Sequence, residues 1–179
     1  YQYQVSKTTE SKNCKIDLTE TPPSQLWDSN QKDHFKKHGE EFPDAKNQKD
    51  YTELAKQFAE DDNNCVLVTY TKVKSGDEPT REVKIKLTQS PGEDFSNDAK
   101  ILVAKKKKTH WKIATFYKWN KEKFPDDPMK RALFNTRFPN ILDKKEQTLK
   151  KTIEELKEEE KKQWVCLWEE LNKKPSNNV

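Results

Sequence analysis

The feature that most constrains this chain is a change in the spacing of its apolar residues near position 62. In residues 51–59, apolar side chains recur every three or four positions, which is the period of one helix face. In residues 83–87, Val, Ile and Leu alternate with lysines, which is typical of a strand with one solvent-facing side. A helical first part followed by a strand-forming second part favours the α+β class.

The two parts predict the order of the elements. Ser24 is a plausible N-cap for a first helix over residues 25–38, and a second helix ends at about Glu60. Four strands follow, joined as an antiparallel meander, at 65–73, 83–87, 101–104 and 110–118. The predicted fold is therefore two N-terminal helices packed on a four-stranded antiparallel sheet.

The two ends of the chain are assigned separately. Residues 1–23 are a linker or an edge strand, because an alternating Tyr-Gln-Tyr-Gln-Val start is followed by polar residues. Residues 24–128 form the α+β domain. Residues 129–179 form a helical extension, in which apolar residues predict one long amphipathic helix over 143–173. This helix either lies over the rest of the fold or binds a partner, since its apolar stripe is as narrow as a coiled-coil seam.

Composition excludes some classes of protein. No apolar run approaches the ~20 residues that cross a bilayer, and no signal-peptide pattern opens the chain, so we expect no membrane insertion. Cys14, Cys65 and Cys166 are an odd number without C-x-x-C spacing, and we expect buried free thiols rather than disulfides or a zinc site. The first residue is Tyr, which suits a C-terminal module cut from a larger polypeptide.

Positive charge is concentrated in one segment. Residues 100–123 hold nine lysines and a single acidic residue, or about +8 locally, which favours a polyanionic partner. The run Lys105, Lys106, Lys107 and Lys108 falls at the tip of the last predicted hairpin. It is either a solvated turn or a set of contacts to a phosphate backbone, which supply affinity without reading sequence.

His34 and His38 are four residues apart and therefore share one face of the first helix. They are structural histidines, a zinc-binding pair or acid–base groups. The zinc interpretation has little support, because no H-E-x-x-H pattern and no nearby cysteine accompanies them. The acid–base interpretation has a physical basis: neighbouring ammonium groups such as Lys37 lower the pKa of an imidazole and keep part of it neutral at pH 7.

The segment Lys37-His38-Gly39-Glu40-Glu41-Phe42, followed by Tyr51-Thr52-Glu53-Leu54-Ala55-Lys56-Gln57-Phe58, resembles the catalytic helix pair of colicin D. It also resembles related ribonucleases of the barnase/EndoU/colicin superfamily, which occur as C-terminal toxins of contact-dependent inhibition and other polymorphic toxin systems. Ile113-Ala114-Thr115-Phe116-Tyr117-Lys118 is similar to the strand that closes the active site there, where a Ser or Thr and an aromatic residue two positions on face the substrate. The resemblance covers residues 24–120.

This resemblance implies metal-independent cleavage of RNA, with tRNA favoured and no cofactor. A 2′-OH attack would give a 2′,3′-cyclic phosphate. The implied catalytic residues are His38, His34, Lys37, Thr115 and Tyr117. The expected RNA-binding residues are Lys36, Lys105, Lys106, Lys107, Lys108, His110, Lys118 and Trp119.

Alternation along a regular strand would place Trp111, Ile113, Thr115 and Tyr117 on one side. The alternative for Thr115 and Tyr117 is ordinary strand packing. The implied partners are RNA and a cognate acidic immunity protein, and the implied route is delivery as part of a larger toxin into the cytoplasm of a target cell.

Two rival functions remain. One is a non-catalytic RNA-binding or ribosome-associated module, and the other is an effector that works through the 143–173 helix.

Overall fold

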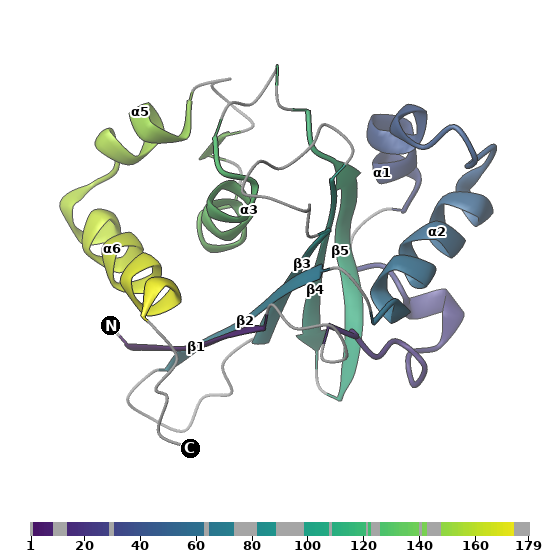
Figure 1. Cartoon of the computed structure of the whole chain (residues 1–179), viewed down its shortest axis with the longest axis horizontal. Coiled ribbons are helices and arrows are strands. Elements are labelled where there is room, and N and C mark those ends of the chain that lie inside the picture. Colours follow the sequence, from purple (N-terminus) through teal and green to yellow (C-terminus); the bar gives the residue numbers. More distant parts are fainter. Residues whose placement is uncertain are drawn as a thin grey trace.

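The computed structural model of the chain describes residues 2–8, 14–28, 31–62, 65–73, 82–88, 99–107, 109–120, 122, 126–139, 141–142 and 148–173. Within these ranges, five strands form one antiparallel sheet in the order β1-β2-β3-β4-β5 (Figure 1). They are β1 (Gln2–Thr8), β2 (Cys65–Val73), β3 (Glu82–Thr88), β4 (Lys100–Lys107) and β5 (His110–Lys118). The helices are α1 (Gln31–His38), α2 (Gln48–Glu60), α3 (Pro128–Arg137), α5 (Leu149–Glu154) and α6 (Glu158–Asn172), with 3₁₀ turns η1 (Pro23–Gln25) and η2 (Gly39–Glu41).

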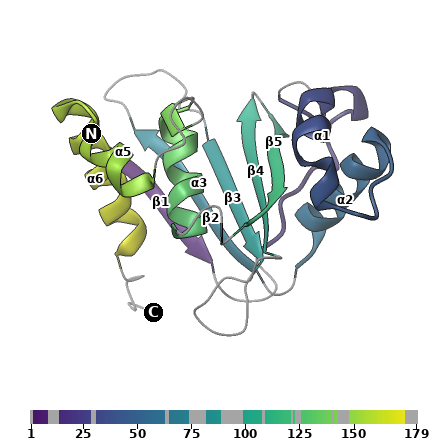
Figure 2. The same cartoon turned by 90° about the horizontal axis from the view of Figure 1, so that it is seen from above.

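Helices cover both faces of the sheet, so the fold has three layers (Figure 2). On one face, which we call the α3 face, side chains of α3, α5 and α6 form a core with residues such as Ile85 and Val103. On the other, the α2 face, side chains of α2 and of residues 14–26 pack on Leu67, Leu102 and Phe116. Helices α1 and α2 lie beside β5, at the opposite edge of the sheet from α6, which contacts β1.

The sequence explains why α2 forms where it does. The Asn47 side chain accepts a hydrogen bond from the Asp50 backbone N–H at 2.8 Å and caps the first turn. The buried residues Tyr51, Ala55 and Phe58 fall on the face predicted from their spacing. The helix ends at Glu60, as expected.

The expected fold, with two N-terminal helices on a four-stranded sheet and one long helical extension, is wrong. A strand begins the described chain: β1 pairs antiparallel with β2 and makes a fifth strand. Among residues 3–8 of β1, Tyr3 is buried and Val5 is partly buried, while the others are polar, and this explains the weak pattern of the strand. Three helices, α3, α5 and α6, follow the sheet instead of preceding it.

The prediction of a single helix over 143–173 is also wrong. Two helices, α5 and α6, occupy its described part, and the chain turns between them at Glu155, whose N–H is shared by the Lys151 and Thr152 carbonyls. The break contains neither Gly nor Pro, which is why spacing alone missed it. The apolar stripe of α6, which includes Trp164 and Leu167, is buried in the core of the α3 face.

The first predicted helix starts later than expected. A short 3₁₀ turn, η1, comes first, and α1 begins only at Gln31. Between them the chain runs beside β5: the Leu26 carbonyl accepts the Ile113 N–H at 2.7 Å, and the Asp28 N–H donates to the Ile113 carbonyl at 2.8 Å. Because these backbone groups bond to a strand, they are not available to a helix.

Cys14 and Cys65 form a disulfide, which corrects the expectation of three free thiols. Both residues are buried in the core of the α2 face, and Cys166 is outside this disulfide. The number of cysteines alone cannot distinguish a chain with one disulfide and one thiol from a chain with three thiols. The bond links Cys14, in the segment that precedes Trp27, to Cys65, the first residue of β2.

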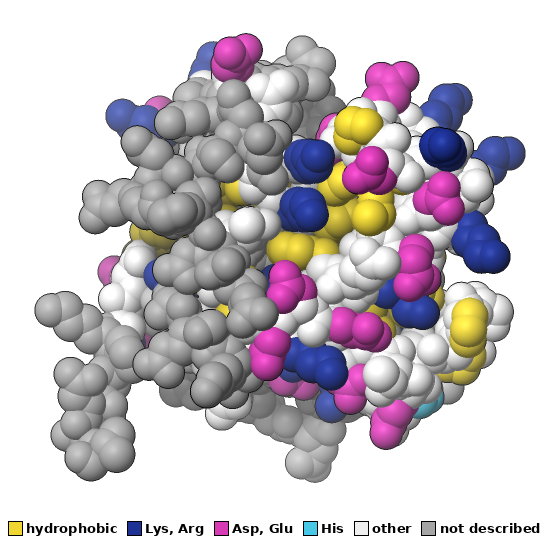
Figure 3. All heavy atoms as spheres, turned by 45° about the vertical axis from the view of Figure 1, so that its right-hand side comes forward, with side chains coloured by type: hydrophobic (Ala, Val, Ile, Leu, Met, Phe, Trp, Pro, Cys, Tyr) yellow, Lys and Arg dark blue, Asp and Glu magenta, His cyan; other side chains and the backbone are white. Residues whose placement is uncertain are grey.

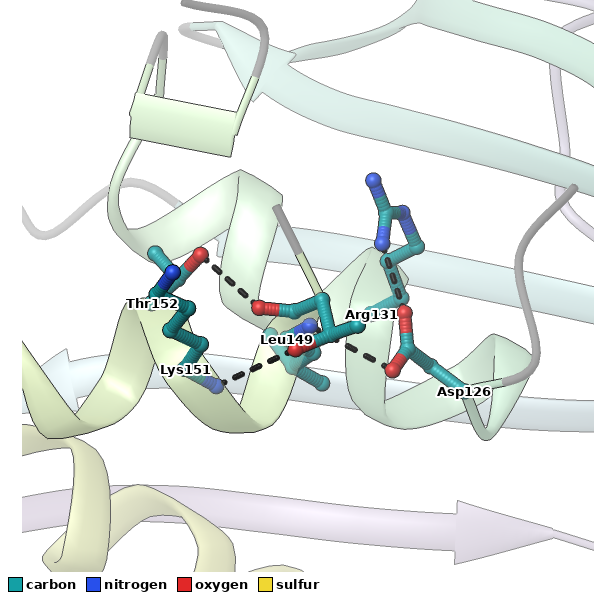
Figure 4. Close-up of polar contacts among 6 residues, drawn as sticks. Asp126, Arg131, Leu149, Lys151 and Thr152 are labelled. Atoms are coloured by element: carbon teal, nitrogen blue, oxygen red, sulfur yellow. Dashed lines mark hydrogen bonds and ion pairs between the residues drawn. The ribbon is translucent and has the colours of Figure 1, made fainter. Parts of the chain in front are cut away.

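A buried ion pair joins the helices of the α3 face (Figure 4). The Asp126 carboxylate accepts a hydrogen bond from Arg131 Nη1 at 2.6 Å and another from the Leu149 backbone N–H at 3.3 Å. The side chains of Asp126 and Arg131 are 11% and 9% exposed. One carboxylate therefore links the first turn of α3 to the first turn of α5.

Candidate functional site

His38 is the last residue of α1, where the chain turns into η2 beside strand β5. Its imidazole ring stacks on the Tyr117 ring with centroids 5.4 Å apart and planes 28° apart. Gly39 follows, and a Cβ at this position would lie 2.9 Å from the Phe35 ring, so the turn suits a residue without a side chain. Folding thus brings the predicted histidine of the first helix against an aromatic residue of the final strand.

Glu41 connects His38 to the backbone of β5. His38 Nδ1 donates to Glu41 Oε2 at 2.9 Å, and the Lys118 backbone N–H donates to Glu41 Oε1 at 2.8 Å. An ionised carboxylate only accepts hydrogen bonds, so Nδ1 carries a proton and Nε2 keeps the lone pair of the neutral ring. Our reasoning from sequence did not assign Glu41 a role. The available signal was its position three residues after His38 in a helical segment.

Aromatic rings extend from His38 through His34 to Trp27, which pairs with Ile113 of β5. The His34 and His38 rings are 6.4 Å apart and tilted by 17°, and the Trp27 and His34 rings are 5.6 Å apart and tilted by 22°. Trp27 Nε1 donates to Thr52 Oγ1 at 3.1 Å, and this bond holds the Trp27 ring against α2. Four near-parallel rings therefore run from Trp27 to Tyr117, and Trp27 is a member that the sequence analysis did not select.

The pKa of His34 is lowered. Burial is the main cause, followed by the positive charge of protonated His38 and by Lys37, while Asp33 acts in the opposite direction. The sequence analysis expected nearby ammonium groups to lower an imidazole pKa at this site. The structure assigns that effect to His34 and gives desolvation the larger share.

The lysines assigned to the site differ in position. Lys36 and Lys37 are exposed on α1. Lys118 Nζ lies 5.0 Å from the centre of the Phe42 ring, a cation–π contact next to the Glu41 bridge. His38, Glu41, Tyr117 and Lys118 thus form one contiguous cluster, with His34 behind it.

A β-bulge decides which way the β5 side chains point. Val103 pairs with Thr115, whereas the next residue, Ala104, pairs with Ile113, so Ala114 is an extra residue in β5. Ile113 faces the core of the α2 face, and Thr115, opposite Val103, lies on the α3 side with Tyr117. The expectation that Trp111, Ile113, Thr115 and Tyr117 share one side is therefore wrong.

Other predicted residues lie at the opposite end of β5. His110, Lys106 and Thr109 line a hollow there, together with Asp17, Glu20, Thr21 and Trp111. Lys84 Nζ and Lys106 Nζ lie 4.5 and 6.0 Å from the centre of the Trp111 ring. Lys105 is half-buried opposite Lys112, while Lys108 and the side chain of Lys107 lie outside the described residues.

Trp119 does not present a surface on which a base could stack. It is 2% exposed and belongs to the core of the α3 face. The predicted residues thus divide into the His38 cluster at one end of β5, the His110 hollow at the other, and a buried tryptophan.

The face of the molecule drawn in Figure 3 is of mixed charge. Figure 3 shows Lys and Arg side chains interspersed with Asp and Glu side chains, with apolar side chains exposed between them. On this view of the described residues, the lysines do not merge into one broad basic patch. The cation–π contacts described above are likewise at separate places: Lys118 lies over the Phe42 ring, and Lys84 and Lys106 lie over the Trp111 ring.

Within the described ranges, no group of three or more His, Cys, Asp or Glu side chains is arranged to hold a metal ion. No described helix combines the length and the apolar character needed to cross a membrane. Comparisons with protein-family models, with curated proteins and with solved structures found no match.

Proposed function

We propose that this protein is a metal-independent endoribonuclease whose base is His38. The observation that carries the proposal is the contact between His38 and Tyr117, supported by the Glu41 bridge. An imidazole with one nitrogen held by a carboxylate and its ring beside a phenol is an arrangement suited to proton transfer. The resemblance of residues 37–42 and 113–118 to colicin-type ribonucleases supports the same conclusion.

In this mechanism Nε2 of His38 accepts the proton of a ribose 2′-OH. The 2′ oxygen attacks the adjacent phosphorus, the bond from phosphorus to the 5′ oxygen breaks, and that oxygen takes a proton from water. The hydroxide left behind takes the proton from Nε2 of His38, which restores the neutral ring. The products are a 2′,3′-cyclic phosphate and a free 5′-OH. DNA lacks the nucleophile and is not cut.

Donors beside the ring stabilise the charge that builds on the phosphate oxygens. The Tyr117 hydroxyl and the Lys37 ammonium group are the groups proposed for this role, and Thr115 is placed on the same side of β5 as Tyr117. His34 supports the His38 ring by stacking. Lys36 and Lys118 bind flanking phosphates, which adds affinity and salt sensitivity.

The proposed biological setting is a toxin module of bacterial competition that acts on RNA, with tRNA favoured, and that is neutralised by an acidic immunity protein. The Cys14–Cys65 disulfide supports a stage at which the protein is outside the reducing cytosol, because such bonds persist in oxidising compartments. A toxin delivered from one cell to another passes through such a compartment.

The test is incubation with total tRNA in EDTA, comparing the wild type with His38→Gln and with Lys49→Gln, a change of an exposed residue of α2, as the control. We expect cleavage by the wild type and the control, loss of at least about 100-fold in His38→Gln, and cyclic phosphate ends on the products. A substrate with a 2′-deoxy sugar at the cut position should resist cleavage. Equal rates for the wild type and His38→Gln would refute the assignment.

The second candidate is a non-catalytic RNA-binding module, and the two lysines over the Trp111 ring favour it. Cations and a partly exposed aromatic ring such as that of Trp111 can bind single strands without a catalytic general base. Salt-sensitive binding of tRNA that depends on Lys84 and Lys106, without cleavage under any condition tested, would select this function.

A further inference from the structure

We propose that Glu41 is the residue that positions His38 for proton transfer by fixing the protonation pattern of its ring. The inference rests on the ribonuclease function proposed above. Glu41 is not expected to touch the RNA, and its effect on the reaction passes through the imidazole alone.

Geometry supports this role because the carboxylate is held at both oxygens. Oε1 accepts the Lys118 backbone N–H at 2.8 Å, so Glu41 is anchored to the edge of β5. Oε2 lies 2.9 Å from His38 Nδ1. The His38 side chain is 14% exposed and that of Glu41 is 33% exposed, so water competes only in part for these bonds.

The chemistry follows from which atoms donate. A carboxylate fixes the proton on Nδ1, and Nε2 is then the atom able to accept the 2′-OH proton. The same bond orients the ring, which Tyr117 contacts on one face. Carboxylates that hold a catalytic imidazole through Nδ1 act in this way elsewhere, by fixing tautomer and orientation.

Glu41→Gln tests the idea with little change of shape. The Gln carbonyl can still accept the Lys118 N–H, while its amide donates to Nδ1. A donor at this position favours the tautomer with the proton on Nε2, which cannot act as the base. The neighbouring residue Glu40 is exposed, and Glu40→Gln removes the same charge without altering the bridge.

The experiment measures kcat and KM for RNA cleavage in both variants, and nitrogen-15 NMR of histidine-labelled protein reads the neutral ring of His38. We expect Glu41→Gln to lower kcat about 100-fold with KM within about twofold, a size typical of residues that orient a working side chain. Its His38 signal should change from the Nδ1-protonated to the Nε2-protonated pattern. Glu40→Gln should match the wild type in both readouts.

The outcomes separate the two proposals. Normal kcat in Glu41→Gln, while His38→Gln is inactive, overturns the positioning role and leaves the ribonuclease intact. A fall in kcat with no change of tautomer also overturns it. If the wild type cleaves no RNA, the ribonuclease proposal fails, and the positioning role for that reaction fails with it. The NMR pattern then shows separately whether the Glu41 bond fixes the ring.

Discussion

Replacing Lys86 by methionine should change how the stability of this protein depends on pH. Lys86 is 0% exposed and lies under the C-terminal end of α2, where its Nζ donates to the Ala59 carbonyl at 3.1 Å and to the Asp61 carbonyl. Burial lowers the pKa of its ammonium group from 10.5 to about 8, although Asp61 and Asp62 act in the opposite direction. The folded chain therefore releases this proton more readily than the unfolded chain does.

The sign of the effect follows from proton counting. Between pH 8 and 10.5 the unfolded chain binds more protons at this lysine, so the free energy of unfolding rises with pH across that window. A difference of about 2.5 pKa units corresponds to at most about 3 kcal/mol. The α2 carbonyls favour the charged form, so we take this value as an upper limit.

At pH 7 the variant should have nearly wild-type stability. Methionine avoids the cost of burying a charge, about 3 kcal/mol on the same scale. It also leaves two helix-end carbonyls without a charged donor, at about 1.5 kcal/mol each. These two effects nearly cancel.

The assay is urea unfolding from pH 7 to 10.5 of the wild type, Lys86→Met and Lys49→Met, the last being an exposed lysine of α2. The wild type should gain up to about 3 kcal/mol relative to Lys86→Met over this range, and Lys49→Met should follow the wild type. A difference between the wild type and Lys86→Met that stays constant with pH would show that the lysine titrates normally.

Two further stability predictions follow from the fold. Reducing the disulfide between Cys14 and Cys65, which are 51 positions apart, should lower the unfolding free energy by about 4 kcal/mol; unfolding with and without a reductant measures it, and equal midpoints would contradict it. Arg131→Ala should cost about 3–5 kcal/mol, because it leaves the Asp126 carboxylate buried without its cation; calorimetry measures this, and a loss below 1 kcal/mol would contradict it.

The sequence predicts well those elements in which the spacing of apolar residues matches the face that is buried in the fold. The four strands from β2 to β5 and helix α2 each bury one face on a core, so the period of their apolar residues matches what is buried. Strand β1 is at an edge and buries little, which made it indistinguishable from a linker. The break between α5 and α6 depends on hydrogen bonds near Glu155 that leave no compositional mark.

The candidate site was predictable in its central pair only. His38 and Tyr117, which the sequence analysis assigned to one site, lie in contact. The orientation of Thr115 was not predictable, since one extra residue at Ala114 reverses the alternation. Glu41 was missed because its importance lies in a bond to the backbone of a distant strand, and a sequence pattern carries no information on such a bond.

The outer edge of β5 has a consequence for solubility. An edge strand offers its backbone groups to any other extended chain, and proteins aggregate through such edges. Here residues 26–28 pair with Ile113. Further along β5, the Tyr51 hydroxyl donates to the Phe116 carbonyl, and the Glu41 carboxylate accepts the Lys118 N–H. Glu41, which holds His38 in the proposed site, is also one of the groups that close this edge. Loss of its carboxylate would therefore uncover the Lys118 N–H to other extended chains as well as release the His38 ring.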